Sequence, residues 1–369
     1  MPGMPSPASP SPGPVPAAAA GSTPAVAGGN WRALPVLRVF VQWGADTSLR
    51  IVALVALALA VAWVVVNARP WAMDPMAFIL DTSNYYAAGE RLNAGHSLYA
   101  YGPGDRHVLA LLFGLPSPYL YPPLMGVLWR PVAAFLPFEP VIIAWWAAGM
   151  VSLLGFLVWL LWRGGRATAA GCLVLIVPLA ITAWSGNVGS FITVAIVGAW
   201  LLIQRGHDRA AGAIIGFTSV LKLSPVFLGW WLLVTRRWNA LAAATAVGLA
   251  SLAVSVAGAG LAAHVEFFHV GDAAARGGGI QASLVGILSA VGVSTDLLPL
   301  VAPTVSVVGV AAVWMLRRHE RAAWAVAIAT GVFASPIFNL TNVTVLLAAF
   351  VAFDGRLLRS SGLRAAAHT

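Results

Sequence analysis

The sequence predicts an all-α membrane protein, a polytopic helix bundle with about ten to twelve membrane segments, some of them short or re-entrant. Only 9% of its 369 residues are charged and 60% are hydrophobic, whereas a soluble domain carries roughly 25% charged residues. The apolar residues form long runs, such as 51–66 and 141–161. Such runs approach or exceed the ~20 residues that cross a hydrocarbon core. We therefore expect a multi-pass protein of the cell membrane.

The chain divides by composition into a tail and a membrane domain. Residues 1–30 hold no Asp, Glu, Lys or Arg and are rich in Pro, Ala, Gly and Ser, which is typical of a disordered tail. Residues 31–360 are predicted to form one transmembrane domain. Two long polar segments, 67–121 and 260–296, interrupt its apolar runs. The basic flanks of the first and last spans predict that both segments face outward.

The positions of the arginines leave one ambiguity in this topology. Counting crossings from the N-terminus and from the C-terminus gives results that disagree by one between residues 120 and 163. Either the segment 122–137 does not fully span the membrane, or Arg163 and Arg166 face outward. The sequence alone leaves both alternatives open.

Composition also excludes several kinds of function. The net charge of +9 does not predict nucleic-acid binding, because the arginines gather in short clusters beside spans, as the positive-inside rule predicts. The one cysteine, Cys172, excludes an internal disulfide or a multi-thiolate metal site. No pair among the seven histidines has metal-ligand spacing, so we expect no metal and no cofactor. No acidic residue lies in the middle of an apolar run, which disfavours a proton or ion pathway.

Asp81 is the strongest candidate for chemistry. It precedes Tyr85 and Tyr86, and the same polar segment continues through Tyr99 to Tyr121. A carboxylate is a natural base for a sugar hydroxyl, and aromatic rings among small polar residues can stack on sugars. A simple N-cap of the following helix would explain the same spacing.

Lys222 is the second candidate, because it is the one lysine in the chain. It stands between two short apolar stretches, three residues before Pro225, which should end the preceding helix. A cation at membrane depth suggests a functional site, and a lipid phosphate would be a fitting partner. A snorkelling lysine at the interface is the alternative.

Two weaker polar breaks complete the set of candidates. Residues 184–190 contain Asn187 and separate two spans, which a plain turn would also explain. Residues 277–284 are glycine-rich and contain Gln281 and Ser283, with Ser283 a plausible helix cap.

At these points the chain resembles the bacterial polyprenyl-phosphate-mannose-dependent alpha-1,2-mannosyltransferases of the GT-C superfamily, whose relatives include branching arabinofuranosyltransferases. The resemblance covers roughly residues 50–355. The residues that carry it are Asp81, Tyr85, Tyr86, Gly95, Leu98, Tyr99, Tyr121 to Leu124, Ala211, Gly212, Gly216, Leu221, Lys222, Pro225, Gln281, Ser283, Leu284, Ser335, Pro336 and Ile337.

The resemblance implies a GT-C fold and an inverting glycosyltransferase with Asp81 as catalytic base. It implies a polyprenyl-monophosphate sugar as donor, with its phosphate at Lys222, and a glycolipid or polysaccharide acceptor at the extracytoplasmic face. The implied substrate-binding residues are Tyr85, Tyr86, Tyr99, Tyr121, Asn187, Gln281 and Ser283.

The sequence departs from the family pattern at two places. Thr341 and Asn342 stand where many members carry a histidine pair, and Asn187 stands in place of a frequent Gln. The sugar therefore stays open between mannosyl and arabinofuranosyl. A transporter or flippase of lipid-linked sugars is the alternative function, although no inverted repeat typical of transporters is visible. A non-catalytic scaffold is a third possibility.

Overall fold

The computed structural model describes residues 44–68, 80–106, 108–110, 115–116, 119–275, 284–294, 296–335 and 340–360. The chain divides into two compact units, Met1–Ala45 and Asp46–Thr369, and the second contains the bundle. The predicted tail, residues 1–30, lies outside the described residues.

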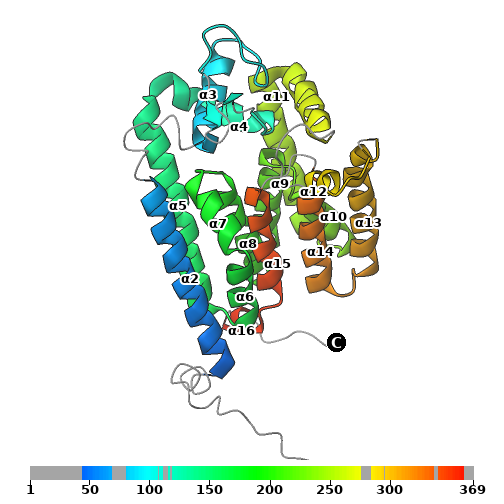
Figure 1. Ribbon diagram of the computed structural model, residues 1–369. Helices are drawn as coiled ribbons and strands as arrows, with labels where there is room; N and C mark the ends of the chain where they lie inside the picture. The colour runs from blue at the N-terminus through cyan, green and yellow to red at the C-terminus, as the bar shows by residue number, and fades with distance from the viewer. Residues whose placement is uncertain are drawn as a thin grey trace, which may run out of the picture. The chain divides into compact units, whose positions relative to one another are not determined.

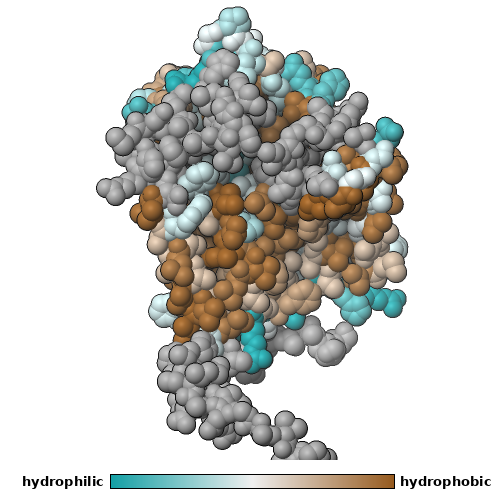
Figure 2. All heavy atoms as spheres, in the orientation of Figure 1, coloured by the Kyte–Doolittle hydropathy of each residue, from teal (hydrophilic) through white to brown (hydrophobic). Residues whose placement is uncertain are grey.

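The prediction of an all-α polytopic membrane bundle is confirmed. Among the described residues, four helical stretches are long and apolar enough to cross a membrane. They are α2 (Gly44–Ala68), α5 (Phe138–Arg163), α11 (Trp238–Ala275), and the short 3-10 helix Leu298–Leu300 together with α13 (Val301–Met315). On the face shown in Figure 2, hydrophobic residues form a band across the middle, with hydrophilic residues above and below it.

Shorter helices fill the space between these spans. The pair α6 (Arg166–Val174) and α7 (Ile176–Trp184) is bent by 60° and forms one broken span or a re-entrant loop. Pro178 lies in the first turn of α7 and has no N–H to continue the helical bonding across the break. The others are α8 (Gly189–Gln204), α9 (Asp208–Leu221), α10 (Val226–Val234), α14 (Glu320–Phe333), η5 (Leu340–Leu346) and α15 (Leu347–Ala352).

Small elements complete the two ends of the bundle. At the upper end in Figure 1 lie α3 (Leu80–Asn93) and α4 (Pro123–Phe135). The remaining elements are α12 (Leu284–Ala290), α16 (Gly355–Ser360) and a minimal antiparallel pair, β1 (Leu109–Ala110) with β2 (Leu115–Pro116).

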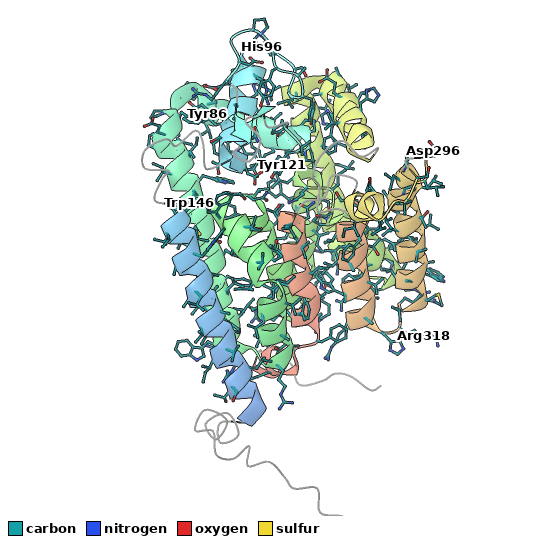
Figure 3. The ribbon with its side chains drawn as sticks, in the orientation of Figure 1. Tyr86, His96, Tyr121, Trp146, Asp296 and Arg318 are labelled. Carbon is teal, nitrogen blue, oxygen red and sulfur yellow. The ribbon has the colours of Figure 1, made fainter. Side chains whose placement is uncertain are left out.

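The basic turns lie together at one end of the bundle. Arg237 forms ion pairs with Asp208 at 3.2 Å and with Glu320 at 2.9 Å, which joins the turns that precede α9, α11 and α14. Arg318 belongs to this end, whereas His96 and Asp296 lie at the opposite end (Figure 3). This separation is the pattern of the positive-inside rule.

The structure resolves the topological ambiguity in favour of a short α4. This helix has 13 residues, which at 1.5 Å per residue span only about 20 Å, less than the ~30 Å of a hydrocarbon core. It lies beside α3 at the upper end, and α5 then runs down the bundle (Figure 1). Arg163 and Arg166 are therefore at the same end as the other basic turns, and the segment 122–137 does not span.

The long helix α11 bends at Gly260, whose φ of 78° and ψ of 163° lie outside the helical region. Positive φ at this value suits glycine. Helical structure then continues to Ala275, so the polar segment predicted to start at Gly260 begins with a helix. Arg130 supports the bend, because its Nη1 donates a hydrogen bond of 2.8 Å to the carbonyl oxygen of Gly258.

Candidate active site

The start of α3 is fastened to the break between α7 and α8. The backbone N–H of Asp81 donates to the carbonyl oxygen of Ser185 at 3.3 Å, and Thr82 Oγ1 donates to that of Gly186 at 3.1 Å. Asp81 lies in the first turn of α3, where the positive end of the helix dipole stabilises a carboxylate. The polar break around residue 187 thereby faces the predicted base.

The Asp81 carboxylate receives a hydrogen bond on each oxygen. The Tyr121 hydroxyl donates to Oδ1 at 2.8 Å, and Asn187 Nδ2 donates to Oδ2 at 2.9 Å. Asn187 Nδ2 also lies 2.7 Å from the Tyr121 hydroxyl and 3.1 Å from Thr341 Oγ1. The bonds from Tyr121 and Asn187 join Asp81 to side chains of two other segments, which an N-cap does not predict. Each carboxylate oxygen still has a lone pair for a further donor.

Tyr121 is fixed by its neighbours. The Tyr99 hydroxyl donates to the carbonyl oxygen of Tyr121 at 2.8 Å, and the rings of Tyr85 and Tyr121 meet edge to face with centroids 4.8 Å apart. Burial, and next the charge of Asp81, raise the pKa of Tyr121 well above its ordinary value. Tyr121 is thus a neutral hydroxyl donor, and it lies inside the bundle, below α4 (Figure 3).

The hydroxyl groups of the predicted residues Tyr85 and Tyr86 contact backbone groups of other segments. The Tyr85 hydroxyl accepts a hydrogen bond of 3.0 Å from the backbone N–H of Val188, which holds the start of α8. The Tyr86 hydroxyl donates to the carbonyl oxygen of Leu136 at 2.8 Å, so this side chain points to the end of α4 rather than to Asp81. Gln281 and Ser283 lie outside the described residues.

Lys222 and Tyr121 both line a cavity of about 410 Å³. Lys222 follows the last residue of α9, and Pro225 caps the start of α10. Its Nζ lies 6.0 Å from the centroid of the Tyr121 ring, and it is within electrostatic reach of Asp81. The cavity is also lined by Ser224, Ser335 and Asn342. The predicted cation and the predicted base therefore both lie close to Tyr121.

A second cavity of about 580 Å³ lies between α9, α10 and α11. Its lining is almost wholly apolar and includes Gly229 and Leu249. It shares five lining residues with the first cavity: Pro122, Leu223, Val226, Phe267 and Phe268. The two spaces are therefore contiguous, one with a cation and the other suited to a hydrocarbon chain.

Sequence reasoning did not identify Thr341 or Ser224 as site residues. The sequence marks Thr341 only as a departure from a family pattern and does not single out Ser224. A polar residue two positions after the single lysine was the available signal for Ser224. Within the described part of the chain, no group of three His, Cys, Asp or Glu side chains is placed to hold a metal ion.

Comparison with known proteins gives a family. A model described as glycosyltransferase family 87 matches residues 119–338, a range that includes Tyr121, Asn187 and Lys222. A similar protein is the polyprenol-phosphate-mannose-dependent alpha-(1-2)-phosphatidylinositol pentamannoside mannosyltransferase of Mycolicibacterium smegmatis, 26% identical over 193 residues. The match covers 48% of this chain and 43% of that relative, so the chain spans less than half of the relative's length. No solved structure matches. The family model covers more than half of the chain, and the chain belongs to glycosyltransferase family 87.

Proposed function

We propose that this membrane glycosyltransferase moves a mannosyl or arabinofuranosyl residue from a polyprenyl-monophosphate donor to an envelope glycolipid or polysaccharide at the extracytoplasmic face. The observation that carries the proposal is the placement of Asp81 and Lys222 around one tyrosine, Tyr121, beside an apolar cavity. A carboxylate, a cation and a hydrocarbon-sized space are the three features that a lipid-linked sugar phosphate requires. The site lies at the end of the bundle opposite the basic turns, which supports the extracytoplasmic side.

The reaction uses Asp81 as general base. The carboxylate takes the proton of an acceptor hydroxyl as that oxygen attacks the anomeric carbon. The bond between the anomeric carbon and the phosphate oxygen breaks, and its electron pair leaves with the polyprenyl phosphate. Attack from the face opposite the leaving group inverts the anomeric configuration. Lys222 stabilises the negative charge that develops on the phosphate.

A transfer assay tests this function directly. The purified chain in nanodiscs is given a synthetic polyprenyl-phosphate mannose with a mannose-bearing glycolipid, and then the corresponding arabinofuranosyl donor. Formation of a glycosylated acceptor with either donor supports the proposal. No transfer with either, together with movement of the donor between leaflets, would favour the flippase alternative.

Replacing Lys222 by Ala is expected to weaken donor binding. A charge-assisted contact to phosphate contributes about 1.5–3 kcal/mol, so the KM for the donor should rise roughly tenfold or more, with a smaller change for the acceptor. Lys222→Arg, which keeps the charge, is the matched variant and should retain most of the affinity. An unchanged KM for the donor in Lys222→Ala would remove Lys222 from the phosphate site.

Replacing Gly229 by Leu is expected to block the prenyl chain. Gly229 lines the apolar cavity, and a Cβ built there meets no atom within 4 Å, so a larger side chain enters the space. We expect kcat/KM to fall about tenfold or more for a long-chain donor and to stay near normal for a donor with a chain of about ten carbons.

Gly155→Leu is the matched control for this experiment. Gly155 is exposed on α5, a Cβ there also meets nothing within 4 Å, and it lines neither of the two cavities. Equal activity of the two variants with the long-chain donor would show that the apolar cavity does not hold the prenyl chain.

A further inference from the structure

Asp81, Tyr121 and Asn187 form a closed ring of hydrogen bonds. Tyr121 donates to one carboxylate oxygen and Asn187 to the other, at 2.8 and 2.9 Å. Asn187 also approaches the Tyr121 hydroxyl oxygen at 2.7 Å. Both partners of the carboxylate are neutral donors, and together they occupy one acceptor position on each of its oxygens.

The orientation of the Asn187 amide is fixed by the backbone. The N–H of Gly189 donates to Asn187 Oδ1 at 2.7 Å, so the NH₂ group faces Asp81 and not the reverse. Asn187 is 1% exposed, so its amide is not turned toward water. Its two hydrogens meet three acceptors, because Thr341 Oγ1 lies at 3.1 Å as well, and only two of them can be satisfied at once.

The resemblance described above implies that Tyr121 and Asn187 bind substrate. Their polar atoms in this structure are instead directed at the carboxylate and at each other. The Tyr121 hydroxyl has one hydrogen, and because it donates this hydrogen to Asp81 it cannot also donate to a sugar. This arrangement suits a role exerted through Asp81 and not through contact with the sugar.

We propose that Tyr121 and Asn187 are positioning residues, which hold the Asp81 carboxylate oriented so that its remaining lone pairs accept the proton of the acceptor hydroxyl. The inference rests on the proposed role of Asp81 as base.

The split between kcat and KM separates this role from substrate binding. Tyr121→Phe keeps the ring beside Lys222 and removes one hydrogen-bond donor to the carboxylate, so Asp81 is held less firmly in the geometry that proton transfer needs. We expect kcat to fall about tenfold, with little change in the KM for the donor or for the acceptor.

Asn187→Asp gives a second, independent variant. An aspartate retains the acceptor for the Gly189 N–H but loses the N–H that donates to Asp81, and its charge repels that carboxylate. We expect kcat to fall further than in Tyr121→Phe, again with little change in KM. Tyr119→Phe is the control, because the Tyr119 hydroxyl donates to the carbonyl oxygen of Pro122 at 3.4 Å. Its kcat and KM should match those of the wild type.

The outcomes separate the inference from the proposed function. A lower kcat at unchanged KM in both variants, with the control unchanged and all proteins monodisperse with similar melting temperatures, supports the positioning role. A raised KM at unchanged kcat overturns it and returns Tyr121 and Asn187 to substrate binding. Full activity of Asp81→Asn, or no transfer by the wild type, overturns the proposed function itself and the inference with it.

Discussion

Asp81→Asn is expected to lose activity by about a hundredfold or more. The amide has nearly the shape of the carboxylate, but it cannot take the proton of the acceptor hydroxyl. The bonds from Asp81 join α3 to the segments around Tyr121 and Asn187, and an amide oxygen can keep one of them, so the fold should persist. The measurement is kcat with saturating donor and acceptor in nanodiscs.

Glu139→Gln is the control for this change. Glu139 is an exposed acidic residue in the first turn of α5, and it lines neither of the two cavities. We expect its activity to stay within about twofold of the wild type, because surface substitutions of this kind have small effects. Turnover by Asp81→Asn near that of Glu139→Gln would show that another group is the base.

Gly212→Val is expected to destabilise the bundle by about 3 kcal/mol. A Cβ at Gly212 would overlap the backbone of Ala240, and one at Gly216 would overlap that of Ala244. Small residues four positions apart let two membrane helices approach closely, and here they let α9 lie against α11. Because the obstacle is backbone, the helices must separate. The apparent melting temperature in detergent and the monodisperse fraction measure this effect.

Gly198→Val keeps the same substitution on α8, where a Cβ meets no atom within 4 Å. Its melting temperature should remain close to that of the wild type. Equal loss in both variants would mean that the β-branched residue itself, and not the contact between α9 and α11, is responsible.

The class of fold could be predicted from composition. A bilayer requires long apolar spans and leaves charged residues in the turns beside them, and the apolar runs and arginine clusters of this chain show that pattern. The segment 122–137 was harder, since Pro131 within α4 and its modest length fit both a short span and a surface helix. The helix beyond Gly260 was not predicted, because a glycine with His264, Glu266 and His269 after it resembles the start of a polar loop. Ala262 and Ala263, with high helix propensity, were the opposing signal.

The site could be predicted only in part. Lys222 stands out as the one lysine in the chain and Asp81 as a carboxylate shortly before two tyrosines, and a family resemblance supplied Tyr121 and Asn187. The contacts among them join residues 106 apart for Asp81 with Asn187 and 154 apart for Asn187 with Thr341. Such contacts depend on how α7, α8 and η5 pack, which local sequence does not determine. For the same reason the turn of Tyr86 toward Leu136 could not be foreseen.

The most direct test of the central claim is the configuration of the new linkage. Wild type and Asp81→Asn, each in nanodiscs, are incubated with a carbon-13-labelled polyprenyl-phosphate sugar and acceptor, and the anomeric carbon of the product is read by NMR. We predict a linkage of configuration opposite to that in the donor from the wild type, release of polyprenyl phosphate in equal amount, and almost no product from the variant. A retained configuration, or comparable product from Asp81→Asn, would contradict single-step displacement with Asp81 as the base.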